Sequence, residues 1–215
     1  MSSISVAGDV SGAISIAAPS AAGSGVLTLP TGTDTLVGKA TTDTLTNKSI
    51  AATQLTGTIA VGRLPAGSVL QVVNTQSGAV ATTTTIIPAD DTIPQITEGA
   101  QFLSLVITPI SATSKLLIQT VMQLSINSGS TCSTALFQDA TANALAASLS
   151  YSAVASAVAI QSINYFMTSG TTSATTFTVR FGPAGGTTVT VNGFAGGRIF
   201  GGVGYSSITI TEIAA

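Results

Sequence analysis

Histidine is absent from the 215-residue sequence, and its absence removes most acid–base and metal chemistry. Histidine is the commonest general base and metal ligand, so Ser–His and Cys–His nucleophiles are excluded. The single cysteine, Cys132, can supply neither a zinc site nor a disulfide within one chain, and we expect it to be a small buried apolar side chain. The remaining candidates for chemistry are carboxylates.

Asp90 and Asp91, followed by Glu98, form the only acidic cluster in the sequence. A glycosidase needs two carboxyl groups facing each other across a sugar, and a calcium site needs several oxygen ligands on one loop. Because Asp90 and Asp91 lie between Pro88 and Pro94, we expect a solvated loop, with a calcium site as the weaker alternative and catalysis as the weakest. No phosphate-binding or dinucleotide-binding glycine motif is present, so we predict no catalytic residue, no cofactor and no enzymatic activity.

Charged residues make up 7% of the sequence, against about 25% in an average protein. The net charge of −2 and the absence of a basic cluster exclude nucleic acid as a partner, since Lys and Arg dominate phosphate binding. No stretch is apolar enough for a membrane helix, and the amino terminus lacks the features of a signal peptide. We therefore expect synthesis in the cytoplasm without a cleaved signal, and no membrane insertion.

The composition changes along the chain and predicts two parts. Residues 1–66 consist largely of Thr, Ser, Ala and Gly, and all ten aromatic residues lie between Phe102 and Tyr205. Pro65 and Gly67 mark the join. We predict an extended β stalk in residues 1–66, with short β-segments in residues 1–25, and a compact head in residues 67–215.

A repeat with a period of nine residues lies in the predicted stalk. The sequence Thr-Asp-Thr-Leu at 33–36 recurs at 42–45, each followed three residues later by Lys. One leucine in nine residues, Leu36 or Leu45, cannot close a core within one chain, but several chains around an axis could bury it. This pattern favours an intertwined oligomer, with a chance repeat as the alternative.

The head is predicted to be an antiparallel β-sandwich of the jelly-roll kind, because short alternating strands are separated by frequent turns. A helix is considered at 140–149, and a strand pair or one long bent strand at 152–167. A turn at 183–186 is expected to return the chain into strand 187–191. The other predicted strands are 68–74, 102–108, 115–126, 133–138, 177–181 and 206–213. The inward residues of the closing strands are predicted to be Phe177, Val179, Phe181, Val189, Val191, Ile208 and Ile210.

Several blocks resemble structural proteins of tailed bacteriophages. Residues 27–30, 33–38 and 42–48 resemble a linker repeat of tail fibres, and residues 54–59 with 63–65 resemble the collar that often follows it. In the head, the blocks that resemble a phage-fibre β-sandwich are 114–118, 136–139, 175–181, 191–193 and 207–213. The resemblance implies a homotrimer carried on the virion and supplies no catalytic motif.

The sequence therefore predicts a short trimeric fibre or spike. Its N-terminal segment would dock on tail or capsid proteins, and its head would contact a glycan or protein of the host surface. A capsid decoration or cement protein with a mechanical role is the alternative, and a capsule-degrading tailspike enzyme is the remote one.

Overall fold

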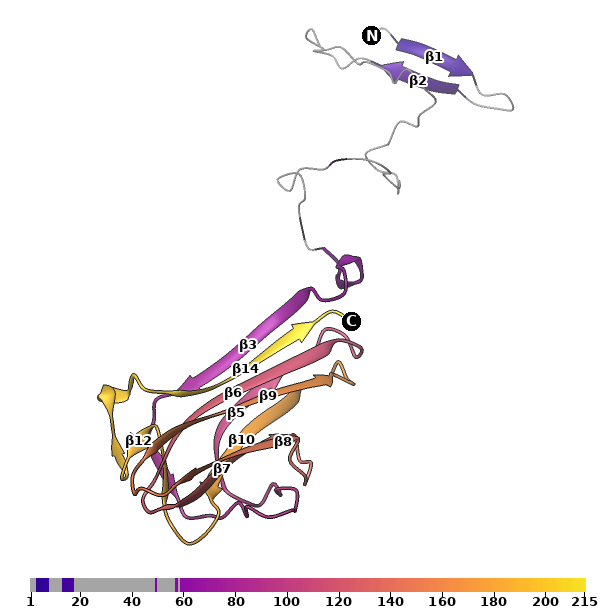
Figure 1. Cartoon of the computed structure of the whole chain (residues 1–215). Helices are drawn as coiled ribbons and strands as arrows, with labels where there is room; N and C mark the ends of the chain where they lie inside the picture. The colour runs from indigo at the N-terminus through magenta and orange to yellow at the C-terminus, as the bar shows by residue number, and fades with distance from the viewer. Residues whose placement is uncertain (1–2, 8–12, 18–48, 50–56, 58) are drawn as a thin grey trace. The chain divides into compact units, whose positions relative to one another are not determined.

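The structure, a computed structural model, describes residues 3–7, 13–17, 49, 57 and 59–215 (Figure 1). The chain divides into two units, Met1–Thr56 and Gly57–Ala215. In the first unit, strands β1 (Ser3–Ala7) and β2 (Ala13–Ala17) pair antiparallel. This agrees with the short β-segments predicted there. The repeat that contains Leu36 and Leu45 lies outside the described residues, so the intertwined stalk and its boundary at residue 66 stay predictions.

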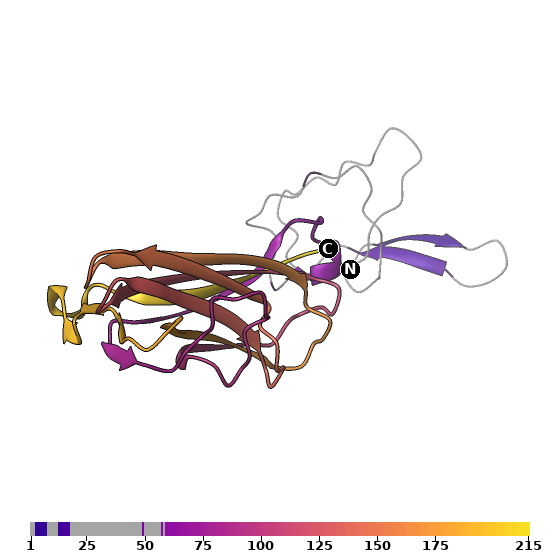
Figure 2. The same cartoon turned by 60° about the horizontal axis from the view of Figure 1, so that its bottom comes forward.

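The second unit is a β-sandwich of two antiparallel sheets, as predicted (Figures 1 and 2). One sheet has the order β5-β10-β7-β8, with β5 at Ala100–Ile107, β10 at Thr175–Pro183, β7 at Ser130–Gln138 and β8 at Ala146–Ser152. The other contains β3 (Val69–Ser77), β14 (Ser206–Ile213), β6 (Lys115–Ile126), β11 (Val189–Val191) and β4 (Ala81–Thr83), in that order, and β9 (Val158–Thr168) pairs with the other edge of β6.

The remaining elements are short. Strands β12 (Gly193–Phe194) and β13 (Gly197–Arg198) pair with each other, and single 3-10 turns lie at η2 (Val61–Arg63) and η3 (Phe200–Gly202). Within the described ranges, no helix reaches the length and hydrophobicity that crossing a membrane requires.

The core lies between the two sheets and is formed by the alternating residues of each strand. On β10, Phe177, Val179 and Phe181 are all at most 1% exposed, and the ring of Phe102 meets Phe181 edge-on at 6.0 Å. The other predicted inward residues, Val189, Val191, Ile208 and Ile210, are fully buried in the same cluster, as are Leu116, Ile118, Met122 and Leu124 of β6. The registers assigned to these strands are confirmed.

The helix considered at 140–149 is wrong. Residues 140–145 form a loop, and β8 begins at Ala146, where Ala146 pairs with Leu136 and Ala147 with Ala135. Helix propensity is a weak determinant of structure even for alanine, the best helix former, and pairing with the free edge of β7 outweighs it. Residues 152–167 do not form a strand pair, because β8 ends at Ser152 and only β9 follows.

The strand expected after the turn at 183–186 is present as β11, but the prediction that it pairs back with β10 is wrong. β10 already has β5 and β7 on its two sides, so it offers no free edge to the next strand. The chain instead crosses to the other sheet, where β11 pairs with β6 and β4. Because of this crossing, Phe181 and Val189 lie on different sheets, and each points toward the other sheet within the same core.

Candidate functional site

The loop that carries the predicted acidic cluster packs on the outward side of β7 in the four-stranded sheet. Ile87 is 1% exposed and packs with Ala135 and Phe137, two outward residues of β7. The guanidinium of Arg180 donates from Nε to the carbonyl of Glu98 (2.7 Å) and from Nη2 to that of Gly99 (2.8 Å). The loop is therefore packed and hydrogen-bonded onto the sheet.

The three acidic side chains do not meet at a shared point. Asp90 Oδ1 accepts hydrogen bonds from the hydroxyl (2.5 Å) and the amide (2.9 Å) of Thr92, and these bonds hold the pKa of Asp90 below its usual value. Glu98 Oε2 accepts from the amide of Gln95 at 2.9 Å, and Asp91 is exposed. Among the described residues no group of three possible metal ligands is found. Asp90 and Glu98 each bind their own stretch of the loop.

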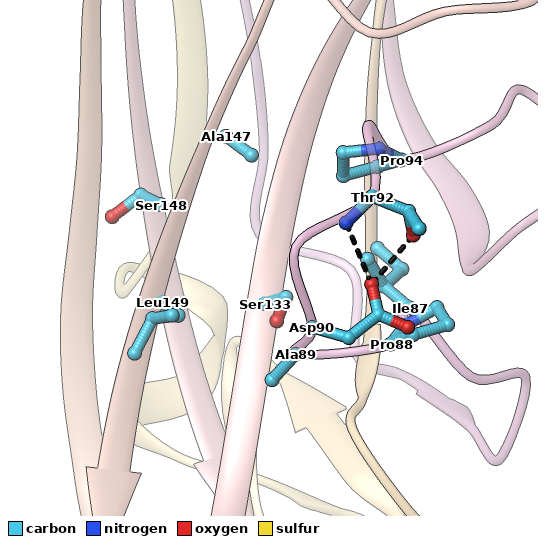
Figure 3. A pocket seen from close by; sticks show the side chains of 10 residues that line it. All are labelled: Ile87, Pro88, Ala89, Asp90, Thr92, Pro94, Ser133, Ala147, Ser148 and Leu149. Carbon is cyan, nitrogen blue, oxygen red and sulfur yellow. Dashed lines mark hydrogen bonds between the residues drawn. The ribbon is translucent and has the colours of Figure 1, made fainter.

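Two shallow hollows flank this loop. Figure 3 shows the first, of about 330 Å³, which lies between the loop and β8 with Ser133 between them. Asp90 is the only ionisable side chain among its ten lining residues. The second, of about 390 Å³, adds Asp91. A carboxyl group opposed to Asp90 across the first hollow would be needed for glycoside hydrolysis, and its lining contains none.

Cys132 is buried as predicted, with 3% of its surface exposed. Burial raises the pKa of its thiol, although hydrogen bonds with Ser150 and Gln161 oppose the rise. A buried neutral thiol is a poor nucleophile. Cys132 therefore belongs to the interior of the sandwich.

Glu212 is the carboxylate that the sequence reasoning missed. It is fully buried, and it accepts hydrogen bonds from the hydroxyl of Ser114 (2.6 Å), the amide nitrogen of Gln71 (2.5 Å) and the backbone amides of Ile110 and Ser111 (2.9 and 3.2 Å). Burial alone raises the pKa of Glu212, but these four donors together outweigh burial and hold the pKa below its usual value. The carboxylate fixes the loop between β5 and β6 and is enclosed by it.

The two most exposed large apolar side chains of the described residues, Val203 and Phe200, lie at the end of the head away from Glu212, on a glycine-rich segment of residues 193–205 that we call the tip. At the near end, the amide of Gly67 donates to the carbonyl of Ala214, so the chain enters the head beside its carboxyl terminus. The tip connects β11 to the start of β14, at the far end of the sandwich (Figure 1). Its exposed apolar residues are Phe194 (47%), Phe200 (72%), Val203 (78%) and Tyr205 (51%).

Asn192 anchors the base of the tip. This residue is fully buried at a positive φ of 54°, and its Nδ2 donates to the carbonyls of Ser77 (2.6 Å) and Ala79 (3.0 Å). Its Oδ1 accepts from the hydroxyl of Ser206 at 2.7 Å. One amide side chain thus joins both ends of the tip to the turn after β3.

The tip is held in an uncommon backbone conformation. Phe200 has a φ of 51°, which is unusual for a bulky residue, and Gly201 and Gly202 that follow it also have positive φ. The tip packs closely on the turn after β3, because a Cβ at Gly78 would lie 2.2 Å from the carbonyl oxygen of Gly202. Local strain of this kind is found where the surrounding structure fixes a functional segment.

The sequence indicated only part of the tip and of the hydrogen-bonded site of Glu212. Asn192-Gly193 was recognisable as a turn signal, but the packing of the tip depends on contacts with residues more than 100 positions earlier in the chain. Glu212 had a readable signal, because it shares the alternation of Ile208 and Ile210 and is therefore predicted to point inward.

No protein-family model matches the chain, and no match was found among curated proteins. Solved structures with a similar arrangement of strands include Eiger TNF from S. frugiperda, with 11% identity and a TM-score of 0.36. The match covers 66% of this chain and 93% of the TNF chain. They also include infectious bursal disease virus, Gx strain (9%, 0.34), and T=1 particles derived from infectious bursal virus (14%, 0.33). The two virus chains cover 67% and 69% of this chain, which spans only 36% and 37% of theirs. At these scores the likeness adds nothing to the fold already described.

Proposed function

We propose that this chain is a non-enzymatic structural protein of a virion, a short trimeric fibre or spike. Its N-terminal segment docks on tail or capsid proteins, and its head contacts the surface of the host cell. The observation that carries the contact role is the tip, which presents four large apolar side chains at the end of the head farthest from the entry of the chain.

The chemistry of the tip supports recognition. Phe200 and Val203 are more than 70% exposed, so burial of these side chains contributes little to the stability of the head. Exposed aromatic groups beside glycines and one arginine are typical of binding loops, because aromatic rings give large contact areas at low entropic cost. Arg198 is the only charged residue of the tip.

The absence of histidine from the sequence, together with the single carboxylate of the first hollow, supports a non-enzymatic role. The N-terminal repeat and its resemblance to phage linkers support docking on the particle and a trimer. Location in the virion is proposed on the same resemblance.

The test measures whether the full-length protein binds to cells of the host and competes with particle adsorption. The variant Phe200→Asn with Val203→Ser removes the two most exposed apolar groups, and Asn tolerates the positive φ of position 200. The matched control is Leu149→Ser with Tyr151→Ser on β8, where both side chains are also more than 60% exposed.

We expect the tip variant to lose at least tenfold in cell binding while the β8 control binds normally. If the tip variant binds and competes as the parent does, the tip is not the contact surface. If neither the parent nor any variant binds cells, and particles lacking the protein are less resistant to heat, the decoration role replaces the fibre role.

A further inference from the structure

The first hollow beside the acidic loop contains a buried hydroxyl that the fold leaves unused. Ser133 is an outward residue of β7 and is 4% exposed, and it lies between Leu149 of β8 and Asp90 of the loop (Figure 3). Among the described residues its hydroxyl has no hydrogen-bond partner, and its oxygen is not one of those fully enclosed in the interior, so it opens into the hollow. Because buried polar groups normally have a partner, Ser133 is free to donate to and accept from a bound molecule.

Asp90 supplies a second unused polar group. Both hydrogen bonds from Thr92 go to Oδ1, so Oδ2 has no partner among the described residues. The same bonds hold the pKa of Asp90 below its usual value, and the carboxyl group is therefore ionised at neutral pH. No lysine or arginine lies in the lining to neutralise it. One carboxylate oxygen can accept hydrogen bonds from two hydroxyl groups of a ligand.

The walls of the hollow are mostly apolar. Ile87, Pro88 and Pro94 line it from the loop, and Ala147 and Leu149 line it from β8. Its volume of about 330 Å³ lies at the lower end of the range of small-molecule sites, which runs from about 300 to 1,000 Å³. Apolar walls with a few polar groups are the usual form of such sites. A saccharide ring has the same division, with C–H groups on its faces and hydroxyl groups around its edge.

The charges of the two hollows disfavour the other classes of ligand. A calcium ion needs several oxygen ligands, and the first hollow offers a single carboxylate. An anion would be repelled by Asp90 and by Asp91, which lines the second hollow. An organic cation is typically held in a cage of aromatic rings, and neither lining contains an aromatic residue. An uncharged ring that carries several hydroxyl groups fits the first hollow best.

We propose that the first hollow binds an uncharged saccharide ring. Ser133 and Oδ2 of Asp90 bond to its hydroxyl groups, and Leu149 packs against its C–H groups. The ring is bound and not cleaved, because no second carboxyl group faces Asp90. One ring in a shallow hollow has few contacts, so we expect a Kd in the millimolar range. A contact this weak adds little to the cell binding that the proposed function gives to the tip, and the two sites are independent.

The test is saturation-transfer NMR on the full-length protein. The probes are D-glucose, D-galactose, D-mannose and N-acetyl-D-glucosamine, each titrated through the millimolar range, with N-acetylneuraminic acid as the anionic sugar. Ser133→Ala removes the buried hydroxyl, and Asp90→Asn removes the charge but keeps an oxygen that can accept from Thr92. The matched control is Ser148→Ala, because Figure 3 shows the hydroxyl of Ser148 pointing away from the loop.

We expect at least one of the four uncharged sugars to receive saturation from the parent and from Ser148→Ala. Its Kd should rise by about fivefold in Ser133→Ala and in Asp90→Asn, the effect of one lost hydrogen bond. N-acetylneuraminic acid should receive none. Circular dichroism checks that each variant keeps its β-structure.

Three results would overturn the proposal. The first is a folded parent that transfers saturation to none of the four sugars, and the second is an unchanged Kd in both hollow variants. The third is displacement of the sugar by trilysine, which would give the hollow to a cationic peptide. If the sugar signal is lost in the tip variant Phe200→Asn with Val203→Ser but kept in Ser133→Ala, the saccharide binds at the tip. That outcome rejects the hollow and leaves the proposed function standing.

Discussion

The carboxylate of Glu212 accepts a hydrogen bond of 2.6 Å from the hydroxyl of Ser114, which lies 98 residues earlier in the chain. Both residues are buried, with Ser114 1% exposed and Glu212 fully enclosed. The bond joins the last strand of the sandwich to the loop before β6. The same carboxylate binds the amides of Ile110 and Ser111, so one charge fixes a whole loop at the entry end of the head.

Glu212→Gln should destabilise the head. The amide cannot accept all four hydrogen bonds, and losing one hydrogen bond to a charged group costs about 1.5–3 kcal/mol. The free energy of unfolding of residues 57–215, measured with urea, should fall by at least that amount. Asp91→Asn, a carboxylate on the exposed loop, serves as the control and should change stability by less than about 0.5 kcal/mol.

The same residue should make stability depend on pH. Because the pKa of Glu212 is lower in the folded chain than in the unfolded one, its stabilising contribution is complete above the ordinary glutamate pKa of 4.5. That contribution is lost as the pH falls further, through the folded pKa. The difference in stability between parent and Glu212→Gln should therefore shrink in acid, and a difference that stays constant from pH 7 to pH 3 would contradict the assignment.

Asn192→Ala should destabilise the head and loosen the tip. The change leaves the carbonyls of Ser77 and Ala79 without their donor and forces alanine into a positive φ. We expect a loss of about 2–6 kcal/mol, from two unpaired groups at about 1–3 kcal/mol each. Asn192→Gly relieves the backbone strain alone, so it should recover about 1 kcal/mol and no more. Faster proteolysis within residues 193–205 would report the loosening.

The sandwich itself was predictable from the sequence because alternation along a strand is a local property. β6 shows this well: its inward residues, Leu116 to Ile126, could be assigned by counting alone. The partner of each strand is not local. Residues 183–191 have the sequence pattern of a hairpin, but both edges of β10 are already occupied. Residues 140–149 have the composition of a helix, but the free edge of β7 pairs with the second half of this segment.

The candidate site was harder to predict for the same reason. Asp90, Asp91 and Glu98 attract attention because they are close in sequence, yet the carboxylates of Asp90 and Glu98 bind local groups of the loop and Asp91 is exposed. Glu212 is isolated in sequence, and its partners Gln71 and Ser114 come from two distant segments. Exposure of Phe200 could not be read at all, since an aromatic residue in a sequence of this kind is ordinarily assigned to the core.

Phe177→Ala tests the core directly. Phe177 is fully buried among the inward residues of both sheets, and truncating a buried phenylalanine typically costs about 3–5 kcal/mol. Thermal and urea unfolding should both register the loss. Phe166→Ala, which removes a ring of β9 that is 58% exposed, should cost less than about 1 kcal/mol.

Neutralising Asp90, Asp91 and Glu98 together, with Asn, Asn and Gln, should leave the fold and particle attachment unchanged. Asn at position 90 keeps an oxygen that can accept from Thr92, and Gln at position 98 keeps one that can accept from Gln95. Melting temperatures of parent and triple variant should agree within a few degrees, with and without calcium. Stabilisation of the parent alone by calcium would instead establish the metal site that the sequence left open.

Leu36→Asp with Leu45→Asp should weaken association through the N-terminal segment without unfolding the head. Burying one leucine contributes at most about 1.5–3 kcal/mol, which a single chain cannot set against about 1–2 kcal/mol of backbone entropy for each ordered residue. Several chains wound together bury both leucines against symmetry mates and pair backbone groups between chains. We therefore expect the variant to be lost from particles and its first 56 residues to be cleaved early by protease, while residues 57–215 keep their β-sheet spectrum. A parent protein that is monomeric by light scattering yet protected from protease over residues 1–56 would show that this segment does not need partner chains.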